Sequence, residues 1–271
     1  MQPYVAMGLP SRSEIRHRPD RLMGAALHAK GPSNIPLVPF SNQSSLLNHC
    51  FNNLWTCLHN LRRQGHDFTH FALLHDDILP DAAWLHTLIG EMDRTGVDFI
   101  SAVVPIKDSR GLTSTATYTD DIWDFRRLTL KELHQMPETV TDGDVGENLL
   151  LNTGCCVLRM RPDAEWVTNP RAFPFNTMER FDDSPLGDGD MVASVVSEDW
   201  LWTDRLRRAG ARLAFTRKVT VIHEGDYEFR NDSDWGRWDS DKAYEKRHEH
   251  EDQVPEGLQV RPERSGELAG V

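Results

Sequence analysis

Long apolar runs are absent from this chain of 271 residues, and its beginning lacks the charged-then-apolar pattern of a secretory signal. We therefore expect a soluble, cytoplasmic protein with no membrane span. Cysteine is also scarce. Cys50 and Cys57 fall within a helical pattern, and Cys155 and Cys156 are adjacent in a strand pattern. Neither spacing is typical of a zinc site, so reduced and buried thiols are expected.

Positive charge is in short supply as well. The chain has 30 Lys and Arg against 42 Asp and Glu, a formal net charge of -12 at pH 7. Such a balance disfavours broad, non-specific binding to nucleic acid, which needs a basic face. Two local basic patches remain open as exceptions: Arg126, Arg127 and Lys131, or Arg205, Arg207 and Arg208.

An apolar run followed by two carboxylates is the central feature of the sequence. Residues 71–74 are all apolar, without alternation, which predicts a strand buried on both faces. His75, Asp76 and Asp77 follow, and Pro80 opens a helical pattern over residues 81–89. The carboxylates would lie at the carboxyl end of a strand, where α/β sheets bind ligands. They predict either a Mg²⁺ or Mn²⁺ site or an acidic turn that caps the helix.

The segments around this run alternate between strand and helix patterns, which is typical of a doubly wound α/β sheet. We expect one domain over residues 1–230 and a charged tail over residues 231–271, partly docked and disordered at its end. Strands are predicted at residues 4–10, 35–40, 97–105, 113–118 (an edge), 149–159, 211–215 and 219–225. Helices are predicted at residues 21–29, 41–63, 129–135 and 197–210.

Two interruptions in this pattern have functional interpretations. The strand at 149–159 contains Asn152, Thr153 and Gly154, which predicts a bulge or a close approach of backbone to a ligand. Residues 173–191 form a long polar loop with scattered aromatic residues, which we interpret as a lid.

Three polar sites recur in order along the chain: His75-Asp76-Asp77 after a strand, Glu198-Asp199 at a helix start, and His223 after a late strand. This order resembles the GT-A nucleotide-sugar glycosyltransferases, particularly the family 2 type, over roughly residues 4–225. The resemblance implies a Rossmann-like, mixed and mostly parallel sheet flanked by helices. The run from Glu198 to Gly210, followed by a strand and His223, is its most specific part.

The resemblance also implies a metal site. Asp77 takes the second acidic position of a D-x-D-like motif and would bind Mn²⁺ or Mg²⁺ together with His223. His75 stands where the family has its first aspartate, so Asp76 is the substitute for that contact to the donor. Departure of a nucleoside diphosphate builds negative charge, which a metal stabilises as a Lewis acid.

The remaining site residues follow from the same resemblance. Asp199 would be the general base that accepts the proton of the acceptor hydroxyl, with Glu198 beside it. A base opposite the leaving group predicts inversion at the sugar carbon, whereas retention is expected if Asp199 only orients the substrate. The acceptor side would be lined by Asn152, Thr153 and Gly154.

The nucleotide is expected at the carboxyl edge of the first strand. Pro10, Ser11 and Arg12 would flank the base, since hydroxyl and guanidinium groups donate hydrogen bonds there. Asn42 would face the same edge if the unit is a right-handed crossover. A UDP-sugar is the expected donor. An ordinary helix cap at Ser11 is the structural alternative.

The acceptor is a hydroxyl group on a saccharide, a small molecule, a protein, a lipid carrier or, as in phage enzymes, a hydroxymethylated DNA base. Two other classes of function remain open. A nucleotidyltransferase usually has a glycine-rich loop after its first strand, and the segment from Gly8 to Arg12 is not glycine-rich. A non-catalytic module that binds a nucleotide-sugar is the third alternative.

Overall fold

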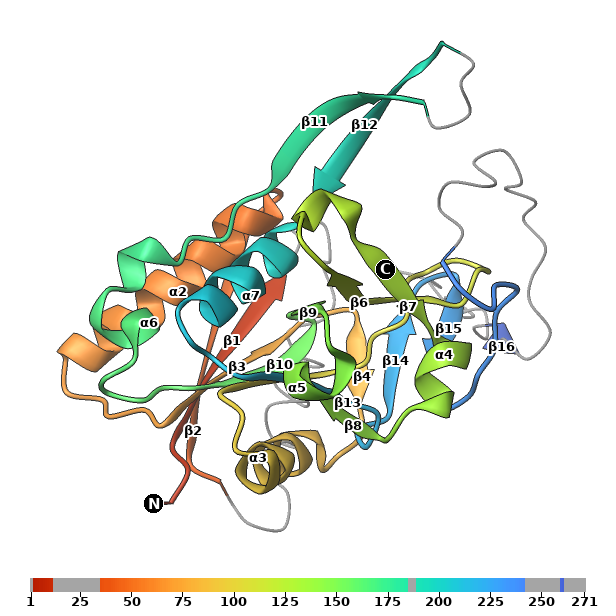
Figure 1. Ribbon diagram of the computed structural model, residues 1–271. Coiled ribbons are helices and arrows are strands. Elements are labelled where there is room, and N and C mark those ends of the chain that lie inside the picture. Colours follow the sequence, from red (N-terminus) through yellow and green to blue (C-terminus); the bar gives the residue numbers. More distant parts are fainter. Residues whose placement is uncertain (1, 12–34, 185–188, 242–258, 261–271) are drawn as a thin grey trace, which may run out of the picture.

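The computed structural model describes residues 2–11, 35–184, 189–241 and 259–260. A seven-stranded sheet of order β2-β1-β3-β10-β5-β13-β8 runs through it (Figure 1). All its strands point the same way except β10 and β8, so the fold is mixed α/β with a mostly parallel sheet, as predicted. The strands are β1 (Val5–Ser11), β2 (Leu37–Gln43), β3 (His70–Leu74), β5 (Phe99–Ala102), β8 (Thr139–Thr141), β10 (Cys155–Arg159) and β13 (Leu213–Thr216).

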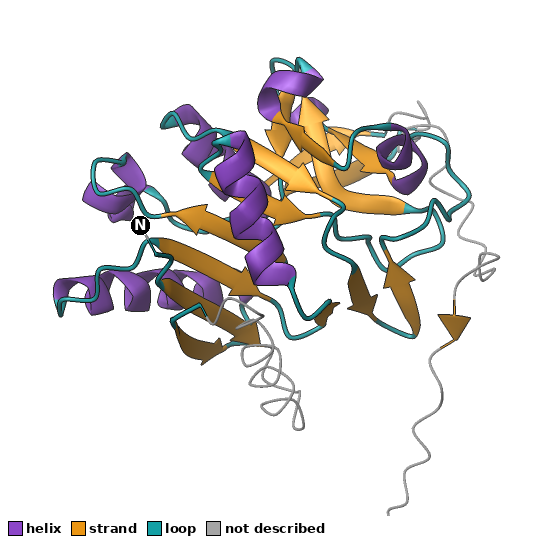
Figure 2. Ribbon diagram, turned by 90° about the horizontal axis from the view of Figure 1, so that it is seen from below, coloured by secondary structure: helices purple, strands orange, loops and turns teal. Residues whose placement is uncertain are grey.

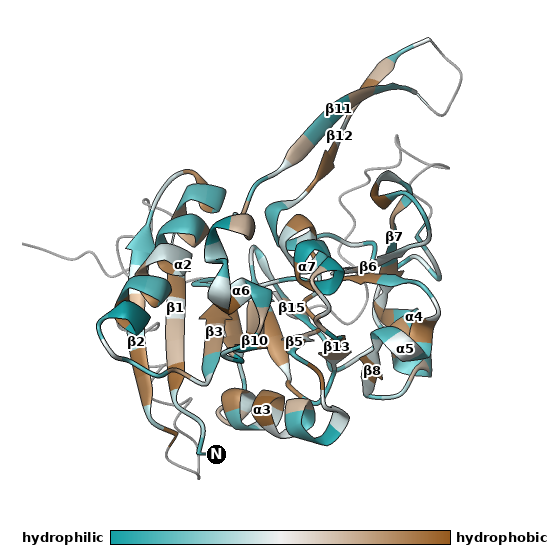
Figure 3. Cartoon of the chain, turned by 60° about the vertical axis from the view of Figure 1, so that its left-hand side comes forward, coloured by the Kyte–Doolittle hydropathy of each residue, from teal (hydrophilic) through white to brown (hydrophobic). Residues whose placement is uncertain are grey.

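Helices cover both faces of this sheet (Figures 1 and 2). On one face lie α2 (Leu47–Arg63) and α7 (Glu198–Arg208), and on the other lies α3 (Trp84–Thr95). In β3, Phe71 and Leu73 pack into the hydrophobic core on the side of α2 and α7. Ala72 and Leu74 pack into the core on the side of α3. This confirms a strand buried on both faces, and Figure 3 shows the hydrophobic centre of the sheet between the helices.

Two smaller sheets lie beside the central one. Their orders are β7-β6-β9 and β16-β15-β14-β4, so the strand predicted as an edge at residues 113–118 is instead the middle of its sheet. The bounds are β4 (Ile78–Pro80), β6 (Leu112–Tyr118), β7 (Arg126–Thr129), β9 (Asn148–Leu150), β14 (Val221–Glu224), β15 (Tyr227–Arg230) and β16 (Gln259–Val260). The short helices are η1 (Ile122–Asp124), α4 (Leu130–Gln135), α5 (Asp142–Val145), α6 (Glu165–Thr168) and η2 (Pro170–Ala172).

Two predicted helix starts are wrong for the same physical reason, which is strand pairing. The helix predicted from residue 41 begins at Leu47, because β2 continues to Gln43 opposite Ser11 of β1. Similarly, Pro80 does not open a helix. It ends β4, which pairs with β14, and α3 begins only at Trp84. The helix predicted at residues 21–29 lies outside the described residues.

The loop predicted as a lid at residues 173–191 is another correction. Its second half belongs to a two-stranded arm of β11 (Met178–Asp183) and β12 (Met191–Val196) that projects from the body (Figure 1). Arg180 lies over the Trp123 ring, with Cζ 4.4 Å from the ring centroid, near the base of the arm. Alternation of exposed and half-buried residues along β12 indicates one free face. Residues 191–196 are rich in valine, and this β-branched composition was the signal for a strand.

Residues 232–241 contact the body of the protein. The backbone N–H of Arg127 donates to Asp241 Oδ2 at 3.0 Å, and Trp235 is 8% exposed. Gly111 has φ of +78°, and a Cβ there would lie 2.5 Å from the carbonyl oxygen of Trp235, so only glycine fits. The domain division at residue 230 stays a prediction. Among the described residues, no helix is long and apolar enough to cross a membrane.

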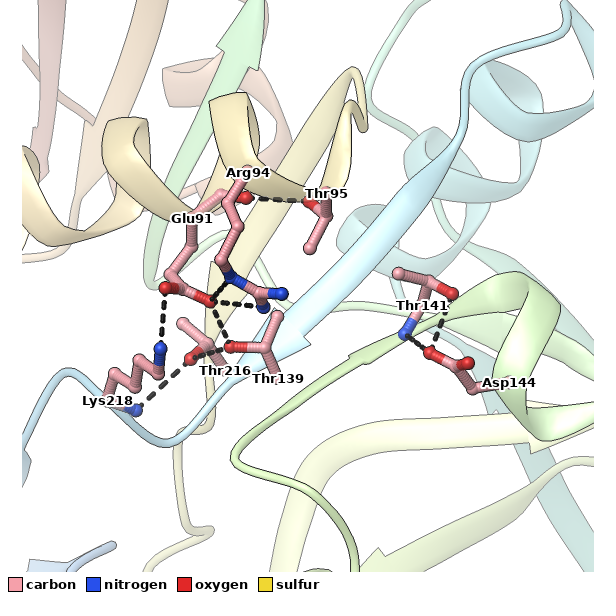
Figure 4. Close-up of polar contacts among 8 residues, drawn as sticks. All are labelled: Glu91, Arg94, Thr95, Thr139, Thr141, Asp144, Thr216 and Lys218. Carbon is pink, nitrogen blue, oxygen red and sulfur yellow. Dashed lines mark hydrogen bonds and ion pairs between the residues drawn. The ribbon is translucent and has the colours of Figure 1, made fainter.

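A buried carboxylate joins α3 to the far end of the central sheet (Figure 4). Glu91 accepts hydrogen bonds from Arg94 and Lys218, each at 2.7 Å, and from Thr139 Oγ1 at 2.6 Å. Thr139 in turn lies 2.8 Å from Thr216 Oγ1 on β13. Burial alone would raise the pKa of Glu91, but the hydrogen bonds from Arg94, Lys218 and Thr139 lower it to about 2.

Replacing this carboxylate is expected to lower the free energy of unfolding in a pH-dependent way. Glu91 has a folded pKa below its unfolded value of 4.5, so its stabilisation is present above that value and is lost as pH falls toward 2. Glu91→Gln should therefore cost about 2–3 kcal/mol at pH 7 and progressively less below pH 4. Urea unfolding at several pH values measures this, with Glu165→Gln on exposed α6 as the control. An equal cost at pH 7 and pH 3 would contradict the prediction.

Candidate active site

Asp77 and His223 meet at the carboxyl edge of the central sheet, although 146 positions separate them. Strand β4 follows Asp77 and pairs antiparallel with β14, which places His223 opposite Ile78. The backbone N–H of Glu224 donates to the carbonyl oxygen of Asp77 at 2.8 Å. His223 Nε2 consequently lies 3.2 Å from Asp77 Oδ2. The predicted convergence of these two side chains is therefore present in the structure.

The tautomer of His223 suits a cation ligand. Its Nδ1 lies 2.7 Å from the carbonyl oxygen of Pro105. Since a carbonyl only accepts, Nδ1 carries a proton, and Nε2 is directed at Asp77 Oδ2; a cation bound between them would take the place of the proton through which Nε2 donates to that carboxylate. Histidines that bind metals in proteins usually donate their other ring N–H in this way, which fixes the ring and raises its basicity.

Lys107 is part of this cluster and was missed in the sequence. Its Nζ lies 2.6 Å from Asp77 Oδ2. Burial would raise the pKa of Asp77, but the hydrogen bond from His223 and the charges of His223, His75 and Lys107 hold it well below its usual range. One sequence signal could have identified Lys107: it is a basic residue shortly after the buried strand β5, whose carboxyl end lies at the same sheet edge as Asp77.

The donor set fits a divalent cation in part. Asp77 supplies carboxylate oxygens and His223 an imidazole nitrogen, both suited to Mn²⁺. Within the described ranges, no group of three or more His, Cys, Asp or Glu is arranged to hold a metal. Further ligands would have to come from a bound diphosphate and from water, which is how Mg²⁺ and similar cations are often held. The ammonium of Lys107 would have to leave Asp77 Oδ2.

The residues predicted for the nucleotide lie along the ends of β1, β2 and β3. Ser11 Oγ donates to Asp76 Oδ2 at 2.9 Å, which joins the first strand to the acidic turn. Asn42 lies opposite Pro10 in the parallel pair of β1 and β2. Ser11 is the last residue of β1, and the segment that it would cap lies outside the described residues.

The two residues before Asp77 differ in their surroundings. The ring of His75 lies against Phe51, with centroids 5.1 Å apart, and its backbone N–H donates to the carbonyl oxygen of Gly154 at 2.9 Å. Asp76 is therefore the member of the pair that reaches the end of β1. Arg12, the third residue predicted to flank the base, lies outside the described residues.

Asp199 begins α7 as predicted, and its surroundings raise its pKa to about 7. Burial is the largest cause, and the neighbouring charge of Glu198 adds to it. Opposing these, the Ser197 hydroxyl and the Trp200 N–H donate to Asp199 Oδ1, and the charge of Arg127 lowers the pKa. A carboxyl that titrates near neutral pH can accept a proton efficiently, as a general base requires.

Arg127 lies between Asp199 and the pair of Asp77 and His223. The sequence predicted it only as part of a basic patch. It stacks on the Trp200 ring, with Cζ 4.3 Å from the centroid, and Nη1 donates to the carbonyl oxygen of Thr113 at 3.1 Å. Thr113 forms a β-bridge with Pro105, whose carbonyl holds His223. A continuous chain of contacts therefore joins the start of α7 to His223.

The segment predicted for the acceptor is interior. Asn152 is 2% exposed, its Nδ2 donates to the carbonyl oxygen of Ala102 at 3.0 Å, and its Oδ1 accepts from the Gly154 N–H at 3.0 Å. Thr153 is fully buried. These side chains shape the turn between β9 and β10, and their place on the acceptor side stays a prediction.

Residues of both basic patches form ion pairs or hydrogen bonds within the chain. In the first, Arg126 pairs with Glu132 and Lys131 with Asp239. In the second, Arg207 and Arg208 both bind Asp204, and Arg205 donates to the carbonyl oxygen of Pro174 at 2.6 Å. These side chains serve packing and ion pairs within the chain.

Comparisons with known proteins leave the family open. No protein-family profile matches the chain, and no curated protein matches it. Among solved structures, the crystal structure of A197 from STIV is similar at 12% sequence identity and a TM-score of 0.49. The similarity covers 87% of this chain and 95% of that chain. At this level of similarity no residue role is transferred, so the site is interpreted from its own geometry.

Proposed function

We propose that the protein is a metal-dependent glycosyltransferase that moves a sugar from a nucleotide-sugar, with UDP as the preferred nucleotide, to a hydroxyl acceptor. The observation that carries this proposal is the pair of Asp77 and His223 Nε2 at the carboxyl edge of the sheet. Ligands of open α/β sheets bind at this edge. Asp199, with its pKa near 7, supplies the base that such a transfer needs.

Each residue has a defined task in the proposed reaction. Asp77 and His223 hold the cation, which when bound supplies Lewis-acid stabilisation for the departing diphosphate. Lys107, released from Asp77, places a second positive charge beside the same leaving group. Asp199 accepts the proton of the acceptor hydroxyl as its oxygen attacks the sugar carbon. Attack from the side opposite the diphosphate gives inversion.

The charges of the surface favour a neutral acceptor. Both basic patches are occupied by partners within the chain, so the structure offers little at those places to a DNA backbone. We therefore propose a saccharide or a small molecule as acceptor rather than a hydroxymethylated base. Arg127 is held by Trp200 and Thr113 and acts on Asp199 instead.

A panel of UDP-, GDP-, CMP- and dTDP-sugars tests the reaction class. With Mn²⁺ present, slow hydrolysis of one donor to sugar and nucleoside diphosphate is expected even without an acceptor, and EDTA should abolish it. Release of pyrophosphate would show a nucleotidyltransferase instead. Binding of a nucleotide-sugar without any turnover would indicate a non-catalytic module and contradict the proposal.

A further inference from the structure

A polar cavity lies at the edge of the central sheet opposite to Asp77 and His223. Helix α2 runs from the carboxyl end of β2 back toward the start of β3, so its last turn is remote from Asp77. There α2 lies beside α6 (Figure 1), and residues of α2, α6 and η2 line a cavity of about 400 Å³. Residues that line it include His59, Arg62, Arg63 and Arg171. The volume is within the range of sites for small molecules.

Three guanidinium groups around this cavity have no carboxylate to pair with. Among the described residues, Arg62, Arg63 and Arg171 form no ion pair within 4.0 Å, although the charge of Asp67 acts on Arg62. Burial lowers the pKa of Arg62, and its Nη1 is buried without a hydrogen-bond partner. In a chain with net charge -12, three arginines around one cavity concentrate positive charge at that place.

His59 adds a buried polar group to the same wall. The residue is 6% exposed, yet its Nε2 has no hydrogen-bond partner. Burial, followed by the charges of Arg62 and Arg63, lowers the pKa of His59 to about 4, so the ring is neutral at pH 7. A buried polar atom left without a partner is costly, which indicates that something polar satisfies it.

A hydrogen bond joins the two walls of the cavity: Trp55 Nε1 on α2 donates to the carbonyl oxygen of Pro170 on η2 at 2.9 Å. Within α2, the Trp55 ring packs edge-on against His59, with centroids 4.4 Å apart, which holds the imidazole in place. Arg62 and Arg63 lie in the last turn of α2, where positive charge offsets the partial negative charge of the helix end. Their presence alone therefore does not indicate a ligand. Arg171 belongs to η2, however, and that explanation does not extend to it.

We propose that this cavity binds a phosphate group carried by a small molecule. Guanidinium groups bind phosphate oxygens through paired hydrogen bonds, and the charges of three of them more than offset that of a phosphate dianion. The neutral His59 ring supplies one further hydrogen bond, and the volume leaves room for a sugar-sized body beside the phosphate. This site is independent of the proposed glycosyl transfer.

Isothermal titration calorimetry of the full chain with inorganic phosphate and with glucose 6-phosphate tests the proposal. EDTA is present, so that the Asp77 site makes no contribution, and ionic strength is held constant with NaCl. Arg63→Gln and Arg171→Gln, both at exposed positions, should each weaken binding about tenfold or more, because each removes a charge-assisted contact. Arg230→Gln, which removes a paired arginine elsewhere, is the matched control and should bind as the wild type does.

The two probes separate the sources of the phosphate. Tighter binding of glucose 6-phosphate than of inorganic phosphate would support a phosphorylated small molecule, and equal binding would support free phosphate as the ligand. No heat from either probe up to about 10 mM, or binding that survives in the Arg63→Gln/Arg171→Gln double variant, would overturn the proposal. Tighter binding of a single-stranded oligonucleotide than of either probe would overturn it as well.

Discussion

Asp199→Asn is expected to slow glycosyl transfer by about 10²–10⁴-fold, the range typical of a lost general base. Asparagine keeps the shape of the side chain and still accepts the N–H of Trp200, so the start of α7 should be preserved. In the wild type, kcat/KM should rise with pH through about 7, because only the ionised Asp199 accepts the proton. Rates of transfer between pH 5.5 and 8.5 measure both effects.

The same variant should be more stable than the wild type at high pH. The folded pKa of Asp199 lies above its ordinary value of 3.8, so between that value and about 7 the folded state binds more protons than the unfolded state. Stability of the wild type therefore falls as pH rises through this window, and the uncharged amide of the Asp199→Asn variant is not subject to that loss. The Tm of the variant minus that of the wild type should increase from pH 5 to pH 8.

An active and destabilised Asp199→Asn protein would contradict the assignment, because a purely structural carboxylate would behave in that way. Asp163→Asn, which changes an exposed carboxylate, is the matched control and should alter neither the rate nor the pH profile. The increase in Tm separates a base from a helix-capping residue, since removal of a capping carboxylate lowers stability.

Asp77→Asn and His223→Ala are each expected to lower metal-dependent turnover by about 10³-fold or more, since each removes a direct ligand of the proposed cation. Asp77→Asn also leaves the ammonium of Lys107 without its partner at 2.6 Å. If both residues hold one cation, the double variant should be little worse than the poorer single variant. Donor hydrolysis as a function of Mn²⁺ concentration measures all three.

Folding must be checked in the same proteins. His223 also holds the carbonyl oxygen of Pro105, so His223→Gln is a second variant in which a hydrogen bond to that carbonyl can be kept. Far-UV circular dichroism and Tm close to those of the wild type would show that the loss is local. Additive losses in the double variant, or full activity in either single variant, would contradict a shared cation.

The convergence of Asp77 and His223 was predicted from the sequence and is present in the structure, whereas their binding of a cation stays a prediction. A polar residue that follows a buried parallel strand lies at the carboxyl edge of the sheet, which places Asp77 after β3, and His223 reaches the same edge from β14 of the neighbouring sheet. The run from Asp77 to Pro80 was predicted less well. A strand of three residues has almost no periodicity, and its pairing with β14 is a tertiary contact that propensity does not encode.

The residues that sequence reasoning missed act through contacts between distant segments. Lys107 reaches Asp77 only because the segments that follow β3 and β5 meet at the same edge of the sheet, a contact between residues 30 positions apart. Arg127 was predicted as part of a surface patch, but it is enclosed by Trp200, Thr113 and the residues near 241. No sequence motif marks the cavity of Arg62, Arg63 and Arg171, because its walls come from two segments about 108 positions apart.

Crystals of the protein grown with MnCl₂ and UDP, measured at the Mn absorption edge, test the central claim most directly. The shared site of Asp77 and His223 predicts an anomalous peak within about 2.0–2.3 Å of Asp77 Oδ2 and His223 Nε2, with Nζ of Lys107 moved away. A peak elsewhere, or UDP bound with no peak between these two side chains, would contradict it.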